Sequence, residues 1–142
     1  MVDKKFYIEN MWHDGPTLEV VIFPPEDTCI LYNKRGMVPP SVKATAMIDT
    51  GASDTTIGPS IIERLELTPE KHLKKSNTAS GVKETKVYRI CVGFKDFTAK
   101  FGVYSLGQPI NEEDIQVLIG RDILQNGGLI YEGKNNFYRL RL

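Results

Sequence analysis

The chain has 142 residues, of which 41% are hydrophobic and 25% are charged, as expected for one globular domain. Its 18 basic and 18 acidic residues balance, which argues against binding of nucleic acid or of an anionic membrane surface, because both usually require a basic excess. No apolar segment approaches the roughly 20 residues that span a bilayer, and the N-terminus lacks the apolar stretch of a secretory signal.

The first third of the chain predicts short strands separated by proline and glycine. Residues 1–16 carry little pattern, and we expect either a tail or an edge strand there. Residues 17–23 predict a strand, and the apolar residues 29–32 predict a second, shorter one. Residues 41–48 alternate clearly, so that one face of a strand would carry Val42, Ala44, Ala46 and Ile48.

The rest of the chain continues this pattern. Residues 82–92 and 97–105 alternate over two longer stretches, which we expect to be joined by a turn at 93–96. Residues 115–119 are nearly all apolar, as in a strand that is buried on both faces. The chain ends in a predicted hairpin, with strands at 129–132 and 137–142.

Helix is scarce in the predicted structure. Residues 60–66 predict one or two helical turns with Ser60 as the N-cap. Residues 122–126 predict another, with Asp122 at its start and two glycines after its end. The fold class that follows is all-β, or mostly β: a closed or rolled sheet with one or two short helices. We expect a single domain over residues 1–142, because no linker or repeat divides the chain.

The cysteines and histidines do not indicate a metal site or a disulfide. Cys29 and Cys91 lie far apart in apolar segments, and we expect two buried free thiols. His13 and His72 lie in polar segments and are expected at the surface. The sequence therefore predicts no metal and no other cofactor, and free thiols together with the absence of a secretory signal favour a cytoplasmic protein.

One segment, residues 46–57, has the properties of a chemical site. An apolar strand ends directly in Asp49, and Thr50 and Gly51 follow. A carboxylate at the end of a core strand must be solvated, hydrogen-bonded or paired. Glycine permits a tight turn with close backbone approach, and a threonine hydroxyl can hold such a turn. Taken alone, the tripeptide is also compatible with a simple turn that closes a strand.

Residues 48–55, Ile-Asp-Thr-Gly-Ala-Ser-Asp-Thr, resemble the active-site signature of the retropepsin-like aspartic peptidases. Residues 117–124, Val-Leu-Ile-Gly-Arg-Asp-Ile-Leu, are similar to the second signature of that family. Between them, residues 76–82 and the following strand resemble the flap, a hairpin that closes over bound peptide. The resemblance covers residues 41–142 and is closest to the cellular and bacterial members. It implies a closed β-barrel lobe with a flap hairpin.

The resemblance also implies a role for each matching residue. Asp49 of each protomer would be catalytic. Thr50, Gly51, Ile119, Gly120 and Arg121 would support the active site, with Arg121 held by a carboxylate such as that of Asp54. Peptide substrate would be bound by a further set of residues: Gly51, Ala52, Ser53, Asp54, Ala79, Ser80 and Gly81.

The chain departs from the retroviral members in three ways. Ser53 stands where many of them carry an aspartate that pairs with the signature arginine, which leaves the partner of Arg121 open. The C-terminal hairpin is longer than their terminal strand, so the dimer interface is open as well. Residues 1–40 have no retroviral counterpart.

The chain contains a single Asp-Thr-Gly and no second Asp-Ser/Thr-Gly. Aspartic peptidases need two carboxylates, one acting as general base on a water molecule and the other as general acid. A twofold homodimer would provide Asp49 and its symmetry mate. The sequence thus predicts an aspartic endopeptidase, active as a homodimer on an extended peptide or protein, with neither nucleic acid nor membrane as a partner.

Two other functions remain open from the sequence. A catalytically idle relative could use the same groove as a peptide-binding or dimerisation module, although such a module would not need the paired carboxylates. A small β-barrel transport or lectin-like protein would fit the strand pattern, but it would explain none of the three matched segments.

Overall fold

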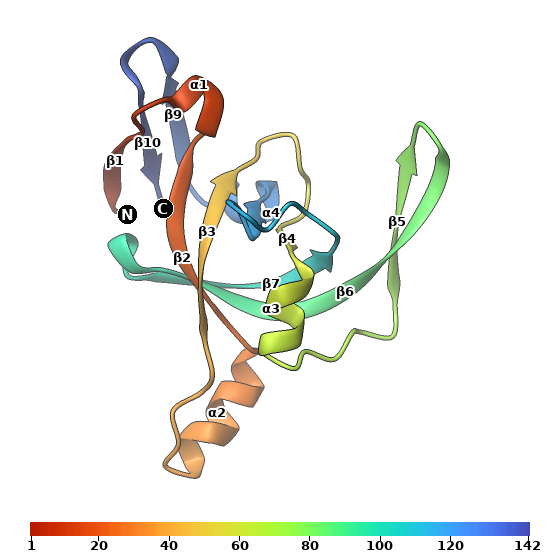
Figure 1. Ribbon diagram of the computed structural model, residues 1–142. Coiled ribbons are helices and arrows are strands. Elements are labelled where there is room, and N and C mark those ends of the chain that lie inside the picture. The colour runs from red at the N-terminus through yellow and green to blue at the C-terminus, as the bar shows by residue number, and fades with distance from the viewer.

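The computed structural model describes the whole backbone of the chain and every side chain except that of residue 78. Ten strands, four short α-helices and two 3-10 turns follow one another along the chain (Figure 1). Their bounds are β1 Asp3–Tyr7, α1 Met11–Asp14, β2 Thr17–Phe23, α2 Glu26–Lys34, β3 Val42–Ile48, β4 Thr56–Ile57, α3 Pro59–Arg64, β5 Leu73–Thr78, β6 Gly81–Phe94, η1 Lys95–Phe97, β7 Ala99–Gly107, β8 Val117–Ile119, α4 Arg121–Leu124, β9 Gly128–Glu132, η2 Gly133–Asn135 and β10 Phe137–Arg141.

Seven strands form one sheet in the order β2-β3-β8-β4-β7-β6-β5. Strand β2 also pairs with β6, so that the sheet closes on itself and leaves β5 outside the closed part. Most neighbours are antiparallel, but β3 lies parallel to β8 and β4 lies parallel to β7. The predicted all-β class with a closed sheet is therefore confirmed, although the helices outnumber the one or two expected.

The core lies inside this closed sheet. The predicted inner face of β3 is confirmed, because Val42, Ala44, Ala46 and Ile48 are all buried. Strand β2 alternates in the same way and buries its second, fourth and sixth residues. Period-two alternation thus fixes which face of each strand turns inward.

The chain termini meet in a smaller, three-stranded sheet with the order β1-β10-β9. Strand β1 is at its edge, so the edge-strand alternative for the first residues is the correct one. The buried Tyr138 of β10 donates a hydrogen bond from its hydroxyl to the carbonyl of Thr17, 2.6 Å away, and burial raises the pKa of this phenol above its usual value. This bond joins the terminal sheet to β2.

The expected strand at residues 29–32 is wrong, because these residues form the middle of α2. Pro25 precedes the helix, Glu26 and Asp27 lie in its first turn, and Lys34 lies in its last turn. The charged residues are in favourable positions beside the helix dipole. Gly36 follows with a φ of 69°, a left-handed conformation that terminates the helix.

The N-cap expected for the helix at residues 60–66 is also wrong. Helix α3 begins at Pro59, and Gly58 is its N-cap without a side-chain hydrogen bond. Ser60 lies inside the first turn, where its hydroxyl and its backbone N–H donate to the carboxylate of Glu112. An acidic side chain from a distant loop therefore caps this helix.

Other element bounds differ only slightly from those expected. The long hairpin is confirmed, but its turn lies at Lys95–Phe97 and not at 93–96. Strand β8 is shorter than expected and begins at Val117. The C-terminal hairpin is confirmed, with η2 at its turn.

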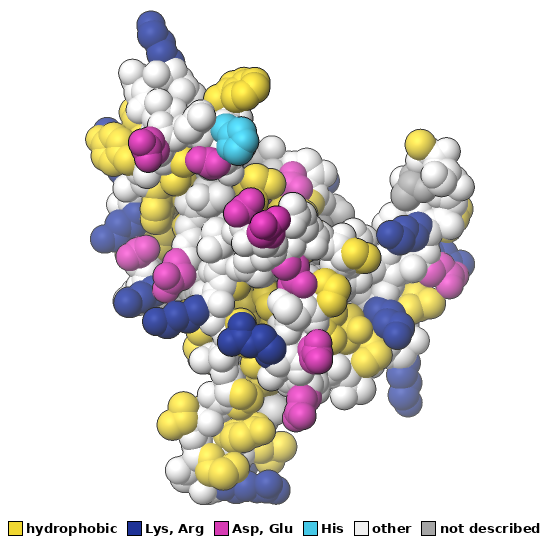
Figure 2. Space-filling view, viewed as in Figure 1, with side chains coloured by type: hydrophobic (Ala, Val, Ile, Leu, Met, Phe, Trp, Pro, Cys, Tyr) yellow, Lys and Arg dark blue, Asp and Glu magenta, His cyan; other side chains and the backbone are white. Residues whose placement is uncertain are grey.

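Strands β5 and β6 form a hairpin that extends out of the body of the protein, as Figures 1 and 2 show. Ala79 and Ser80 form its turn, and Gly81 follows with a φ of 113°, a conformation that suits glycine. The expected hairpin is thus present. The side chain of residue 78, which belongs to the segment compared with a flap, lies outside the described residues.

Candidate active site

Asp49 lies at the end of β3, where the sheet delivers it to a loop. Ile48 is paired with Ile119 in the parallel β3–β8 register, and the N–H of Asp49 donates to the carbonyl of Ile119 at 2.9 Å. Ile48 and Ile119 are buried, whereas Asp49 is only partly buried. The strand is therefore anchored in the core up to the residue before Asp49, and its carboxylate is accessible from outside.

The loop after Asp49 is a tight turn. A carboxylate oxygen of Asp49, Oδ1, accepts a hydrogen bond from the N–H of Gly51 at 2.9 Å, and the carbonyl of Asp49 accepts from the N–H of Ala52 at 3.2 Å. A Cβ on Gly51 would lie 3.2 Å from the same Oδ1, closer than a side chain is normally tolerated. Glycine at this position thus lets the backbone orient the Asp49 carboxylate.

Helix α4 holds the loop from behind. The N–H groups of Arg121 and Asp122 donate to the carbonyls of Ala52 and Ser53, at 2.9 and 3.1 Å. The Arg121 guanidinium donates from Nη1 to the carbonyl of Thr50 at 2.7 Å. The expectation that a carboxylate such as Asp54 holds Arg121 is therefore wrong: the described partner of its side chain is a backbone carbonyl of the loop that carries Asp49.

Gly120 lies in close contact with this loop, as the sequence predicted. A Cβ at position 120 would lie 2.6 Å from the carbonyl carbon of Asp54 and 2.9 Å from the nitrogen of Thr55. Neither backbone atom can move away cheaply, because Thr55 is completely buried. Glycine is therefore required here by the close approach of two backbones.

Another polar contact between the loop and α4 involves Thr55 and Asp122, which the sequence did not assign to the site. The carboxylate of Asp122 accepts from the N–H and the hydroxyl of Thr55, at 2.9 and 2.8 Å. The Thr55 hydroxyl in turn accepts from the N–H of Gly120 at 3.1 Å. The only sequence signal for this pair was a hydroxyl residue in the first signature and an acid in the second.

Asp54 connects the loop to the β5–β6 hairpin. Its Oδ2 accepts from the hydroxyl of Ser53 at 2.8 Å and lies 3.6 Å from the ammonium nitrogen of Lys74 on β5. The side chains of Lys74 and Asp54 are 49% and 24% exposed, so the ion pair is partly solvated and contributes little to folding stability. It does place a cation of the hairpin beside the loop.

The proposed substrate residues fall into two groups in the structure. Gly51, Ala52, Ser53 and Asp54 lie together on the loop, whereas Ala79, Ser80 and Gly81 lie at the end of the hairpin. Figure 2 shows a hollow between the hairpin end and the body of the protein. The Asp54–Lys74 pair joins the loop to strand β5 of the same hairpin.

The cysteines offer no competing nucleophile in the described structure. Cys29 and Cys91 are free and buried, as predicted, and burial raises the pKa of both thiols. A thiol with a raised pKa is a poor nucleophile at neutral pH. The accessible reactive group near the loop is thus the carboxylate of Asp49.

Within the described part of the chain, no helix has the length and apolar composition to cross a membrane.

Comparisons with known proteins place this geometry in a family. The model of a family described as aspartyl protease matches residues 36–123, which is more than half of the chain and includes the loop and most of α4. No sequence among the curated proteins matches at a significant level.

Several solved structures are similar in fold. The EIAV protease, solved with the inhibitor HBY-793, is 21% identical, with a TM-score of 0.50 over 78% of this chain and 86% of that one. The simian foamy virus (mac) protease is 18% identical, with a TM-score of 0.49 over 77% and 91%. A retropepsin-like aspartic protease from Rickettsia conorii is 18% identical, with a TM-score of 0.49 over 87% and 90%.

The family model covers Asp49, whose N–H is hydrogen-bonded to Ile119, and the hydrogen-bonded group of Thr55, Gly120 and Asp122. The closed sheet of this chain and its similarity in fold to the EIAV protease agree with the match to the family model. This chain belongs to the aspartyl protease family, and its fold is retropepsin-like.

Proposed function

We propose that this chain is an aspartic endopeptidase whose active site contains two Asp49 carboxylates, one from each subunit of a homodimer. The observation that carries the proposal is the position of the only Asp-Thr-Gly of the sequence. Its aspartate is accessible, its carboxylate is oriented by the N–H of Gly51, and its loop is fixed to β8 and α4 by backbone hydrogen bonds. Such a rigid and accessible carboxylate suits general acid–base catalysis.

A single carboxylate is not sufficient for this chemistry. Two carboxyl groups about 3 Å apart share one proton, so that one can accept a proton from water while the other protonates the scissile amide. A twofold axis beside the loop would bring each Asp49 against its own symmetry mate. The partial exposure of Asp49 and the exposure of Thr50 and Gly51 in one chain support such an arrangement.

The neighbouring residues have roles that follow from this arrangement. Thr50 would donate a hydrogen bond to the loop of the partner subunit and keep the two carboxylates nearly coplanar. Gly51 would offer its carbonyl to the backbone of an extended peptide. Ala52, Ser53 and Asp54 would line the adjacent subsite, since they follow on the same loop.

Support for the loop and closure over the substrate come from other elements. Ile119, Gly120 and Arg121 would hold the loop in place; their contacts with residues 49–55 support this role. The β5–β6 hairpin would act as a flap that closes over the peptide through Ala79, Ser80 and Gly81 and excludes water. An extended substrate would then lie between hairpin and loop in the manner of an added strand.

We also propose that residues 1–142 form one domain and that it works in the cytoplasm. The main core contains residues from both ends of the chain, including Met11 and Leu142, and this supports a single domain. The two free thiols support a reducing compartment.

Dilution tests the dimeric active site. Below the dissociation constant of the dimer, its concentration falls with the square of the protein concentration, so a tenfold dilution should lower the rate of peptide hydrolysis about a hundredfold. The measurement is the initial rate on a mixed peptide library over a wide range of protein concentration, at mildly acidic pH. A rate that stays proportional to concentration down to the lowest value would contradict the proposal. A folded dimer without turnover would identify a binding module instead.

A further inference from the structure

The end of helix α2 combines exposed apolar side chains with basic ones. Ile30, Leu31, Met37 and Val38 have exposed fractions of 44%, 55%, 47% and 89%. Lys34 and Arg35 lie among them in the sequence and are exposed as well. We call these six residues the α2 tip. Exposed apolar side chains are usually scattered singly over a surface, so a cluster of four on one projection indicates a contact surface.

The α2 tip projects from the protein. Figure 1 shows α2 extending from the body at the end opposite to the loop between β3 and β4, and Figure 2 shows apolar side chains with a basic group gathered there. Hollows of about 400 and 460 Å³ lie on the sides of α2. Within α2, all of which is described, Cys29 is the only buried residue. The helix therefore covers little of the core.

The charge of this region differs from that of the whole chain. Between residues 28 and 48 the sequence contains Lys34, Arg35 and Lys43 and no acidic residue, although the complete chain is neutral. The nearest acids on α2, Glu26 and Asp27, lie in its first turn, and Asp27 is paired with Arg89 of β6. The tip is thus basic and apolar, while the acidic end of the helix faces the body.

We propose that the α2 tip binds the surface of an anionic lipid bilayer. Apolar side chains that enter the boundary between headgroups and acyl chains, with cations beside them that contact lipid phosphates, are the features of peripheral membrane binding. A second copy of this chain fits less well, because a twofold contact would bring two copies of the same basic side chains into one interface. The balanced overall charge, which argued against a membrane, conceals this local excess.

The position of the tip leaves the active-site loop accessible. Strand β3 begins next to the tip at Val42 and ends at Ile48, directly before Asp49. Seven residues of strand span roughly 20 Å, so a membrane at the tip would lie about that far from Asp49. Helix α2 also lies outside the segment that matches the family model, although Met37 and Val38 of the tip lie at the beginning of that segment. Lipid binding would therefore be an addition to the proposed peptidase activity and does not depend on it.

Sedimentation with lipid vesicles tests this proposal. The intact chain is mixed with vesicles of phosphatidylcholine alone or with about 30% phosphatidylserine, a strongly anionic surface, and the pelleted fraction is measured. We expect binding at least about tenfold tighter to the anionic vesicles, and its loss at high salt, because the attraction is screened. Arg35→Glu and Val38→Asp should each weaken binding by about fivefold or more.

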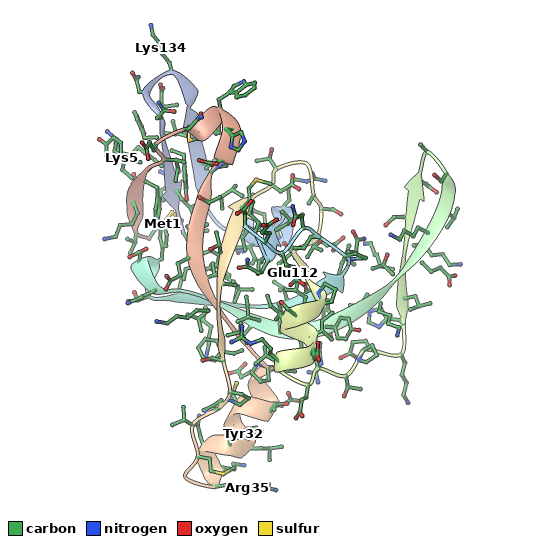
Figure 3. All side chains as sticks on the ribbon, viewed as in Figure 1. Met1, Lys5, Tyr32, Arg35, Glu112 and Lys134 are labelled. Atoms are coloured by element: carbon green, nitrogen blue, oxygen red, sulfur yellow. The ribbon has the colours of Figure 1, made fainter. Side chains whose placement is uncertain are left out.

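The matched control is Lys134→Glu. Figure 3 shows Lys134 at the opposite end of the molecule from Arg35, so the charge change is the same but the place differs. We expect this control to bind as the unchanged chain does, and all variants to keep their thermal midpoint. Equal binding to both kinds of vesicle, no binding, or equal weakening by Lys134→Glu would overturn the proposal. A Val38→Asp variant that changes the oligomeric state but not vesicle binding would assign the tip to a protein contact.

Discussion

Replacing Asp49 by asparagine is expected to lower the rate of peptide hydrolysis by about 10²- to 10⁴-fold, the range that general acid–base catalysis contributes. Asparagine cannot take a proton from water or return one to the leaving amine. Its side-chain oxygen can still accept the hydrogen bond from Gly51 that the Asp49 carboxylate accepts, so the loop should keep its shape. The measurement is turnover of a peptide library by the two proteins at equal concentration.

A matched control separates this effect from a general effect of charge. Asp96 is exposed and lies in the turn between β6 and β7, away from the loop. Asp96→Asn makes the same chemical change and should retain nearly full activity. The proposed mechanism would be wrong if Asp49→Asn, shown by circular dichroism to be folded, kept normal turnover.

Replacing Asp122 by alanine should lower the free energy of unfolding by about 2–4 kcal/mol. The buried N–H and hydroxyl of Thr55 would lose the carboxylate that accepts both of them. Each buried polar group left without a partner costs about 1–3 kcal/mol, and bonds to a charged acceptor are the stronger ones. Because this carboxylate also fixes the loop to α4, activity should fall in the folded variant too. Urea unfolding and turnover measure the two effects.

Asp114 provides the control for stability. It is an exposed acid in the segment before β8, and Asp114→Ala should change the free energy of unfolding by less than about 0.5 kcal/mol. If Asp122→Ala were as stable as Asp114→Ala, the hydrogen bonds between Asp122 and Thr55 would not hold the loop, and our account of its rigidity would be incorrect.

The sheet could be predicted where alternation and burial agree. The residues Val42, Ala44, Ala46 and Ile48 share one face in the sequence pattern and are all buried in the structure. The place of Gly120 behind the loop was implied by the resemblance of residues 117–124 to the second family signature, because the local pattern alone fits a simple strand-to-helix connection equally well. Asp49 could be located because its strand ends directly before it.

Residues 29–32 show why the local hydrophobic pattern alone could not distinguish a strand from a helix. A run of four apolar residues fits a buried strand and a helix equally well. The deciding signals lie on either side of it: Pro25 and two acids before the run, and Lys34 and Gly36 after it. These residues define a helix start and stop, and they outweigh the strand preference of the apolar run.

The partners of charged side chains could not be predicted, because they depend on tertiary contacts. Arg121 was expected beside a carboxylate, yet its guanidinium donates to the Thr50 carbonyl. Asp54 was the carboxylate expected to pair with Arg121, but it lies beside Lys74 of the hairpin. Likewise Ser60 is a residue type that often caps a helix N-terminus, but the helix already begins at Pro59, one residue earlier.

Mixing the unchanged chain with Asp49→Asn tests most directly whether two subunits share one active site. Total protein is held constant, the subunits are allowed to exchange, and turnover is measured against the fraction of the variant. If both carboxylates are needed, only dimers of two unchanged chains are active, and an equal mixture should retain about one quarter of the activity. Retention of one half, the value for independent active sites, would contradict a shared Asp49 pair.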